Sequence, residues 1–305
     1  MKDLKMKIGL IFLLIIASLL LLRTSTVAQE KKLISEKSFE VKSGESLHVE
    51  TSGADVKVLS WDKNEALIKI FGNKKAENEI YFEIEKVEDG IKVIAKKKKR
   101  LLFDFGVALN LRIDAYVPKN YNCEINTSGG DIRLNDIQGE HKLNTSGGDI
   151  ELEKLSGNIK AKTSGGDIKL KNVTGKLDVS TSGGDINCKD VVGELYASTS
   201  GGNIVVDYIS GMIEAFTSGG DIKITIQDEF KGLQAKTTGG DIFINLPAFA
   251  KASVELETTG GEIECDFSNS KTYKVTRKRL LAEFNGGGNK LRAYTTGGDI
   301  ILKEK

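Results

Sequence analysis

A short motif recurs through the second half of this 305-residue chain, mostly at intervals of 18 residues. The sequence Thr-Ser-Gly-Gly-Asp-Ile begins at Thr127, Thr145, Thr163, Thr181 and Thr217, and close variants begin at Thr199, Thr237, Thr258 and Thr295. A weaker copy begins at Thr51. Repetition with this period is typical of solenoids, in which each repeat forms one layer of a stack. The last interval is 37 residues, about two periods, so we expect one degenerate coil with an insertion there.

Apolar residues occupy alternate positions after each motif. The first apolar column is Ile132, Ile150, Ile168, Ile186, Ile204, Ile222, Ile242, Ile263 and Ile300, and the second is Leu134, Leu152, Leu170, Cys188, Val206, Ile224, Ile244, Cys265 and Leu302. Polar residues such as Arg133 and Glu151 lie between the two columns. A period of two indicates a β-strand with one buried face rather than a helix.

A second strand follows a second recurrent glycine, found at Gly139, Gly157, Gly175, Gly193, Gly211 and Gly232. Behind this corner the alternation resumes, for example at Leu177 and Val179. Continuing the same parity by two places reaches the motif threonine. We therefore expect the threonine column to face inward or to lie at the corner, where a β-branched residue packs well.

One such two-strand unit cannot bury its apolar side alone, but stacked units can. Layers about 4.8 Å apart would also pair their backbone groups with the layers above and below. We predict an all-β fold: a parallel β-solenoid, a single-stranded β-helix with about 18 residues per coil, over residues 121–305. A left-handed triangular helix of three hexapeptides per coil is the alternative. The glycine corners disfavour it, because they divide the period into two segments rather than three.

Residues 1–28 have the three parts of a secretory signal peptide: an N-terminal region with three lysines, an apolar run from Ile8 to Leu22, and a short polar segment that ends at Ala28. The apolar run is shorter than the roughly 20 residues of a membrane-spanning helix. We expect cleavage after Ala28 and export to the periplasm, the cell surface or the extracellular space; an uncleaved N-terminal anchor is the alternative. No second run of membrane length follows, so no span is expected after cleavage.

Residues 29–120 are rich in β-type patterns but lack the 18-residue period. We interpret them as a β-rich N-terminal cap with the first irregular coils, because the ends of a solenoid need polar covers. Alternation predicts strands over residues 80–84, 91–95 and 107–117. Pro118 is expected to end the last of these strands, and Asn73 to mark a turn.

The charge composition excludes one class of function. Lys and Arg number 44 against 43 Asp and Glu, a net charge of +1, which argues against a nucleic-acid-binding protein. The basic run at residues 96–100 has two interpretations: a solvated hairpin tip, or a contact with acidic envelope polymer or lipid headgroups.

An insertion over residues 268–294 contains the triple glycine Gly286–Gly288. It is not a phosphate-binding loop, because it lacks the Lys-Ser/Thr pair of that motif and no helix is expected after it. We interpret it as a tight crossing back into the final coil.

The motif aspartates form a column of like charge: Asp131, Asp149, Asp167, Asp185, Asp221, Asp241 and Asp299, interrupted by Asn203. Unpaired, these carboxylates would repel one another. One interpretation is that each caps N–H groups of its own Ser-Gly-Gly turn. The other is that Ca²⁺ bridges neighbouring coils, which the single acid per motif and the glycine spacing disfavour. We predict no metal site and no cofactor.

The chain offers little for catalysis. It has 2 His and 3 Cys. His141 falls in the column of Ile159 and is expected to be a satisfied structural residue, and no Ser-His-Asp or Cys-His arrangement can be built from the spacing. We therefore name no catalytic, cofactor-binding or metal-binding residue and predict that the protein is not an enzyme.

Coil register also predicts the state of the cysteines and the outward apolar residues. Cys188 and Cys265 share a column four coils apart, about 19 Å, which is too far for a disulfide. With Cys123 they are expected to be buried free thiols. The outward apolar positions Val205, Phe216, Phe243 and Ile301 lie on coils that are not all neighbours.

The iterated Thr-Ser-Gly-Gly-Asp-Ile, the segment Glu283–Gly288 and the final motif at Thr295 resemble the bacterial putative-adhesin families of unknown function, which include the head GIN domain adhesins. The resemblance covers residues 40–305 and implies a right-handed single-stranded β-helix and adhesion. It carries no catalytic residues. Three functions follow as hypotheses: an exported scaffold that binds envelope polysaccharide or a surface protein, an envelope-stress or regulatory accessory protein, and, disfavoured, a carbohydrate-active β-helix enzyme. The sequence leaves the oligomeric state open.

Overall fold

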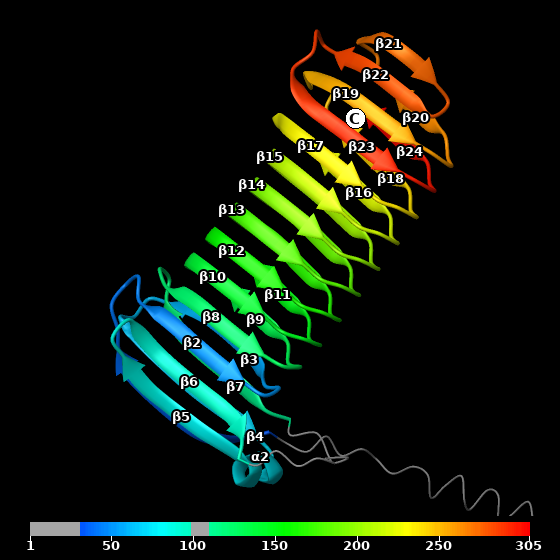
Figure 1. Ribbon diagram of the computed structural model, residues 1–305. Coiled ribbons are helices and arrows are strands. Elements are labelled where there is room, and N and C mark those ends of the chain that lie inside the picture. Colours follow the sequence, from blue (N-terminus) through cyan, green and yellow to red (C-terminus); the bar gives the residue numbers. More distant parts are fainter. Residues whose placement is uncertain (1–30, 99–109) are drawn as a thin grey trace, which may run out of the picture.

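The computed structural model describes residues 31–98 and 110–305. They form one long β-solenoid built from stacked, mostly parallel strands (Figure 1). The predicted all-β parallel solenoid is thereby confirmed. The predicted signal peptide lies outside the described residues, as do Lys99 and Arg100 of the basic run and the first residues of the strand expected from 107 to 117.

Strand β13 (Ile168–Ser180) shows the plan of one coil. Its first half pairs in parallel with the matching half of β14 (Ile186–Ser198), and after two corners its second half pairs with β14 again. β14 pairs in the same way with β15 (Ile204–Phe216). The solenoid therefore has two faces, each a parallel sheet, and the chain passes from one face to the other twice in each coil.

We call the surface that follows the Gly-Gly-Asp turns the motif face. It contains the first halves of β13–β15 together with β7 (Arg112–Pro118), β3 (Asp55–Trp61), β9 (Ile132–Asn135), β11 (Ile150–Glu153), β16 (Ile222–Ile226), β18 (Ile242–Leu246), β24 (Ile300–Glu304) and β20 (Ile263–Asp266).

We call the opposite surface the glycine face, because its strands follow the second recurrent glycine. It contains the second halves of β13–β15 together with β6 (Gly90–Lys97), β2 (Ser46–Thr51), β8 (Asn122–Thr127), β10 (Gln138–Asn144), β12 (Ser156–Lys162), β17 (Phe230–Lys236), β23 (Asn289–Thr295) and β19 (Ala252–Thr258).

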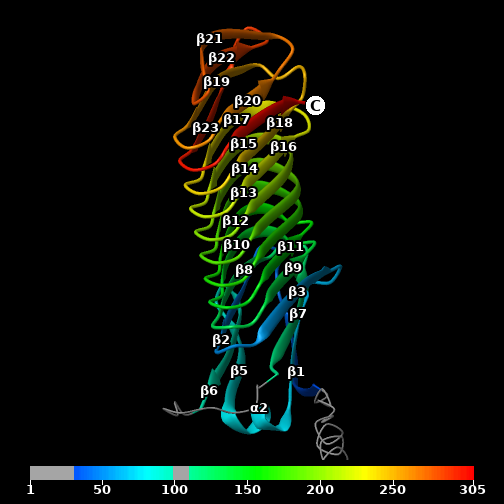
Figure 2. The same cartoon turned by 90° about the vertical axis from the view of Figure 1, so that its right-hand side faces the viewer.

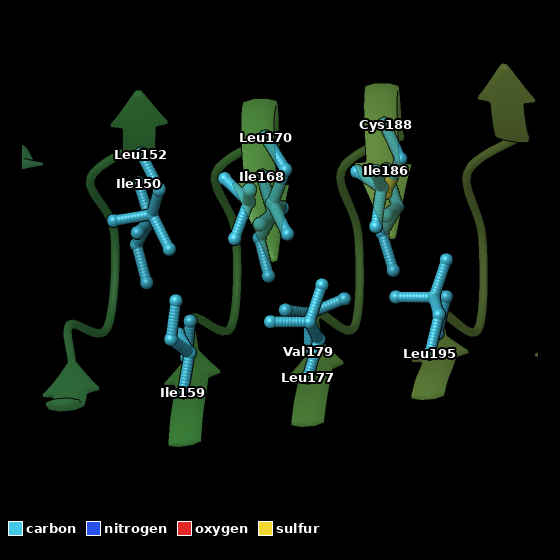
Figure 3. Packing of buried hydrophobic residues seen from close by; sticks show 14 of the residues in the cluster. Ile150, Leu152, Ile159, Ile168, Leu170, Leu177, Val179, Ile186, Cys188 and Leu195 are labelled. Atoms are coloured by element: carbon cyan, nitrogen blue, oxygen red, sulfur yellow. The ribbon is translucent and has the colours of Figure 1, made fainter. Parts of the chain in front are cut away.

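The core is a set of side-chain columns between the two faces. Ile150, Ile168 and Ile186 lie directly above one another, as their strand pairing requires. Leu177 and Leu195 face them from the glycine face, and all of these side chains are at most 2% exposed (Figure 3). Burying one such aliphatic side chain contributes about 1.5–3 kcal/mol. The columns read from the sequence are thus the columns of the core.

Two corners join the motif face to the glycine face within a coil. At the first, Asp136, Lys154, Asn172 and Asp190 adopt left-handed backbone with φ between 54° and 59°. Asn and Asp tolerate this conformation better than most residues, although the sequence analysis did not identify this corner. At the second, Gly175 has φ 138°, and a Cβ there would lie 2.0 Å from the carbonyl oxygen of Gly157. Only glycine fits that approach.

The motif threonines form a buried ladder at the opposite edge. The Thr163 hydroxyl donates to the Gly148 carbonyl of the preceding coil at 2.9 Å and accepts the Gly166 N–H of its own turn at 3.3 Å. Corresponding bonds recur from Thr145 to Thr295. The expectation that this column lies inward at the corner is confirmed, since each motif threonine is at most 7% exposed.

The N-terminal end is not stacked in chain order. β2 lies between β6 and β8, and β3 lies between β7 and β9. The first coil of the chain therefore lies between the second and the third. Beyond it, β4 (Glu65–Gly72) pairs antiparallel with β7, and β1 (Lys32–Glu40) with β4. On the glycine face, β5 (Ile80–Val87) pairs antiparallel with β6. These strands and helix α2 close the lower end in Figure 2.

Helix α2 (Lys74–Glu79) corrects one expectation. Asn73 was expected to mark a turn, but its side chain accepts the Ala76 N–H at 2.9 Å and caps the helix N-terminus. Asn is a preferred residue at this position. The expected strands at 80–84 and 91–95 are confirmed as β5 and β6.

The C-terminal end overturns the expectation of a degenerate coil. β23 lies between β17 and β19, and β24 lies between β18 and β20. The last coil of the chain therefore lies between the two coils that precede it in sequence. The residues between them form β21 (Ser270–Thr276) and β22 (Arg279–Phe284), an antiparallel hairpin whose second strand pairs antiparallel with β19. The 37-residue interval is long because it contains this end cap rather than an extra coil.

The triple glycine carries the chain over β19, from β22 to β23. Gly286 and Gly287 both have φ 83°, and a Cβ on Gly288 would lie 2.6 Å from the Lys251 carbonyl oxygen. The expected tight crossing into the final coil is confirmed.

Candidate binding surfaces

The aspartate column forms a ladder of side chain to backbone hydrogen bonds. The Asp149 carboxylate accepts the N–H of Asp167 at 2.8 Å, and Asp167 accepts the N–H of Asp185 at 2.9 Å. Asn203 continues the ladder, because an amide oxygen accepts the Asp221 N–H equally well, at 2.8 Å. The interpretation that each acid caps its own turn is therefore wrong in one respect: the N–H belongs to the next coil.

Within residues 31–98 and 110–305, no three His, Cys, Asp or Glu side chains are grouped so that they could hold a metal ion. The ladder uses one carboxylate oxygen of each aspartate for the backbone. What it does chemically is to join successive coils and to offset part of the repulsion between the acids.

A groove of about 500 Å³ runs over β2, β8, β10, β12 and β13 on the glycine face. We call it the mixed-charge groove. Lys142 pairs with Glu124 at 2.8 Å, and Lys160 with Asp178 at 3.3 Å. The hydrogen bond from Lys142 lowers the pKa of Glu124, and His48, 3.4 Å away, acts in the same direction. Because charges of both signs alternate along it, the groove does not select strongly for one sign of ligand.

His141 lies beneath this groove and faces the core. It pairs with Cys123 and Ile159 in the predicted column and is 2% exposed. Neither ring nitrogen has a hydrogen-bond partner of ordinary geometry among residues 31–98 and 110–305, so the expectation of a satisfied histidine is wrong. Burial lowers its pKa to about 4, against a smaller opposing effect from the Ile137 backbone.

Aromatic side chains gather on the outer side of the glycine face. Tyr196 and Phe216 have ring centroids 5.6 Å apart, and Lys236 lies 5.5 Å over the Tyr294 ring. Phe216 is the parallel partner of Lys236, and Lys236 of Tyr294. We call these four residues the aromatic stripe. It crosses four successive coils, about 14 Å at the interstrand spacing.

Tyr196 is 42% exposed, and Met212 beside the stripe is 46% exposed. Hydrogen bonds with Thr296 and Thr259 lower the pKa of Tyr294. Sequence reasoning identified only Phe216. It missed Tyr196 because that contact is diagonal between columns, and it missed Tyr294 because the last coil is inserted out of chain order.

The other outward apolar residues lie on the motif face. Val205 pairs with Lys223, Lys223 with Phe243, and Phe243 with Ile301. Phe243 and Ile301 are therefore adjacent, although in chain order a further coil separates them. The insertion of β24 beside β18 brings them together.

The three cysteines are free, as expected. Following the strand pairs, Cys188 and Cys265 are separated by five coil steps, not four, because the Leu302 coil lies between those of Ile244 and Cys265. Burial raises the pKa of Cys188 to about 12 and that of Cys265 to about 11. Cys265 is half-buried rather than buried.

The described part of the basic run makes local contacts at the N-terminal end. Lys96 pairs with Glu50 across β6 and β2. Lys98 donates its ammonium to the Asn78 carbonyl at 2.8 Å and its N–H to the Glu79 carbonyl at 2.8 Å. These contacts place the run at the edge of the cap, beside α2 and β5.

Across residues 31–98 and 110–305, the structure contains no helix that is both long enough and apolar enough to cross a membrane. A comparison with curated protein sequences finds no match.

Several solved structures are similar to this chain at low identity. A putative adhesin from Bacteroides fragilis is 11% identical with TM-score 0.41, over 91% of this chain and 99% of that one. A putative lipid binding protein from Parabacteroides distasonis is 14% identical with TM-score 0.41, over 88% and 96%. A putative adhesin from Parabacteroides merdae is 11% identical with TM-score 0.36, over 90% and 97%.

A family model matches the chain over residues 38–303, which includes every coil of the solenoid and both end caps apart from residues 32–37 of β1 and the last residue of β24. The chain therefore belongs to the Toastrack DUF4097 family.

Proposed function

We propose that the protein is an exported, non-enzymatic solenoid that binds an envelope polysaccharide through its glycine face, as an adhesin or envelope scaffold does. The observation that carries this proposal is the aromatic stripe. Partly exposed aromatic rings and a cation lie in a row on a rigid sheet, and the mixed-charge groove continues along the same face.

The chemistry of the stripe suits a sugar polymer. Aromatic rings provide flat apolar surface on which the C–H faces of sugar rings stack, and the neighbouring Gln234 and Arg292 provide hydrogen-bond donors on the adjacent column. The stripe is set by sheet pairing rather than by loops, so little conformational freedom is lost when a ligand binds. Two of the solved structures similar to this chain are described as putative adhesins.

The test is binding of purified variants to immobilised envelope polysaccharide from the source cells. Replacing both rings in Tyr196→Ala/Phe216→Ala removes the centre of the stripe and is expected to weaken binding at least about tenfold, since the loss of two stacking contacts is worth more than 1.4 kcal/mol. Phe249→Ala is the matched control, because Phe249 is 63% exposed but lies outside the stripe. Equal binding by wild type and the double variant would refute the proposal.

Export and the absence of catalysis have separate tests. N-terminal sequencing of the mature protein from cells is expected to begin at Gln29, and a chain that begins at Met1 would contradict cleavage. Incubation with a panel of envelope glycans is expected to give no change in their size, and any turnover would show that the protein is an enzyme.

A further inference from the structure

The outermost strand of the glycine face at the C-terminal end is unusually bare. Among the described strands, β21 pairs only with β22, and each of its seven residues is exposed. Tyr273 is 57% and Val275 66% exposed. Lys271 and Lys274 on this strand make no ion pair with the described residues, and Arg277 and Lys278 follow in the turn. β21 is therefore a free, basic edge with apolar side chains.

β21 also extends beyond the end of the opposite face. On the glycine face β22 and β21 continue beyond β19, whereas on the motif face β20 is the last strand and pairs with β24 alone. The inner side of β21 consequently has no opposing strand to cover Val275. Figure 1 shows this hairpin at the extreme end of the rod.

At the other end of the same face, the outermost strand carries the opposite charge on its outward side, with Lys92 and Lys96 of β6 opposite Glu85 and Tyr81. Within the part of the chain that the structure describes, β5 pairs only with β6. Its outward residues include Tyr81, which is 49% exposed, and then Glu83 and Glu85, which make no ion pair with the described residues. Tyr81 donates a hydrogen bond to Glu83 at 3.0 Å, much as Tyr273 donates to Glu283 at 2.6 Å at the basic end.

The strand directions of the two edges are complementary. β22 runs against the coil strands and β21 runs against β22, so β21 follows the coil direction. β5 runs against β6 and therefore against the coil direction. When a second copy continues the axis of the first, its β5 meets β21 in an antiparallel arrangement, the more stable kind of strand pairing.

We infer that the protein assembles head to tail with further copies of itself, through antiparallel pairing of β21 of one copy with β5 of the next. The pairing places Lys271 and Lys274 on the same side of the joined sheet as Glu83 and Glu85. It also covers Tyr273 and Val275 with a neighbouring strand. Opposite charges and aromatic pairs are the side-chain combinations that stabilise paired strands.

The alternative of two β21 strands pairing with each other is disfavoured by charge. It would place Lys271 and Lys274 beside their own copies, and like charges on facing strands destabilise the pair. Lysine on an edge is a common defence against self-pairing. The same lysines attract acidic side chains, and β5 of the same chain presents Glu83 and Glu85.

A head-to-tail contact uses two different patches and does not close on itself, so it extends into a line of molecules. Every copy then presents its aromatic stripe on the same face of the line. This consequence rests on the proposed function, because many weak sites in a row would bind a long polymer with increased avidity. The assembly itself needs no ligand and is tested without one.

The experiment is a charge exchange in the purified mature chain, followed by sedimentation velocity at low and high salt. Wild type is expected to form concentration-dependent oligomers that dissociate at high salt. K271E/K274E alone and E83K/E85K alone are each expected to be monomeric. Their equimolar mixture is expected to oligomerise again, because each variant then supplies an edge whose charge is opposite to that of the other.

Three outcomes would overturn the inference. A wild-type chain that stays monomeric at every concentration refutes the inference. Oligomers lost in K271E/K274E but kept in E83K/E85K would show that β21 pairs with something other than β5. Two monomeric variants whose mixture stays monomeric would show that the substitutions act on folding or on separate contacts; circular dichroism of each variant checks its folding independently.

Discussion

The two ends of this solenoid cover their outermost coils in different ways. At the N-terminal end, β1 and β5 are tied together: Lys37 donates to the Ile84 carbonyl at 2.9 Å, and Lys86 donates to the Glu40 carbonyl. Helix α2 lies beside them. At the C-terminal end, β21 extends beyond the opposite face and each of its residues is exposed. One end is closed by its own side chains, and the other is left open.

Both ends nevertheless share one device. In each, a coil is inserted one layer inside the stack, and antiparallel strands lie outside it. An inserted coil is paired on both sides, so the coil nearest the chain terminus is held by neighbours rather than left to fray. Interior coils therefore follow the repeat, whereas the ends are built by changing the order of the layers.

The largest expected effect comes from removing the inserted coil at the open end. Deleting residues 289–305 removes β23 and β24, whose Leu291, Ile300 and Leu302 are fully buried. The loss of these three side chains costs about 5–9 kcal/mol. We expect hydrogen exchange to show that amides of β19–β22 lose protection while those of β13–β15 keep it, because stability in a solenoid is local.

The matched deletion at the closed end removes residues 31–40, an outer strand that pairs only with β4. Its effect on the neighbouring strands is expected to be smaller, because β1 has no fully buried side chain. If β19 stays protected after the C-terminal deletion, then β19 has docked directly on β17 and the inserted coil is not what holds the end.

The insertion marks the limit of what the repeat could predict. Strands, columns and the threonine ladder follow from the sequence, because every coil satisfies the same backbone and core requirements. Layer order does not follow, since the coils that begin at Thr258 and Thr295 carry the same motif and either could stack on the Thr237 coil. Connectivity through Gly286–Gly288 decides the order, and the same reversal brings Tyr294 into the aromatic stripe.

The second prediction concerns the loss of stability in acid that His141 is expected to cause. The pKa of His141 is about 4 in the folded chain, below the ordinary value of 6.5, because burial disfavours the charged ring. As pH falls below 6.5 the unfolded chain takes up the proton first, so stability is lost between pH 6.5 and 4, by up to about 3 kcal/mol. We expect His141→Leu to reduce this loss, measured by urea denaturation at pH 7.5 and 4.5.

His48→Gln is the control, because His48 lies at the surface of the same end and pairs with Asp89 rather than facing the core. It is expected to leave the loss between pH 6.5 and 4 in place. An unchanged acid sensitivity in His141→Leu would show that another group causes it. Burial of His141 was predictable from its column, but its lack of a partner was not, because the depth of the core beside it depends on packing between the two faces.

The third prediction compares the threonine ladder at the two ends. Thr295 donates to Gly240 at 2.8 Å and accepts from Gly298 at 3.3 Å, so Thr295→Val removes the side-chain partner of two partly buried backbone groups. The expected cost is about 1–3 kcal/mol. With the described residues, Thr51 makes one side-chain hydrogen bond, accepting the Ala54 N–H at 3.2 Å, so Thr51→Val is expected to cost less. Equal losses in thermal unfolding would mean that the hydroxyl donor bond contributes nothing.

The smallest expected effect on stability comes from Lys37, and it separates the closing of the N-terminal end from assembly between copies. β5 and β6 form a hairpin with a two-residue turn, in which facing residues alternate between hydrogen-bonded and non-hydrogen-bonded pairs. Ile84 and Val93 form a non-hydrogen-bonded pair, so the Ile84 carbonyl points away from β6. Lys37 occupies that carbonyl in the single molecule. Lys37→Met keeps the apolar stem and removes the donor, and we expect it to change stability by less than about 1 kcal/mol.

The same substitution is expected to strengthen head-to-tail association, because the Ile84 carbonyl becomes free for the N–H of an incoming β21 and no lysine has to be displaced. Sedimentation velocity at matched concentrations measures the shift toward larger species, with Lys69→Met as a control on the strand next to β1, where the lysine pairs with Glu36. Weaker association in Lys37→Met would mean that β5 must be tied to β1 before it can receive a partner, and the closed end would then be a prepared surface rather than a guarded one.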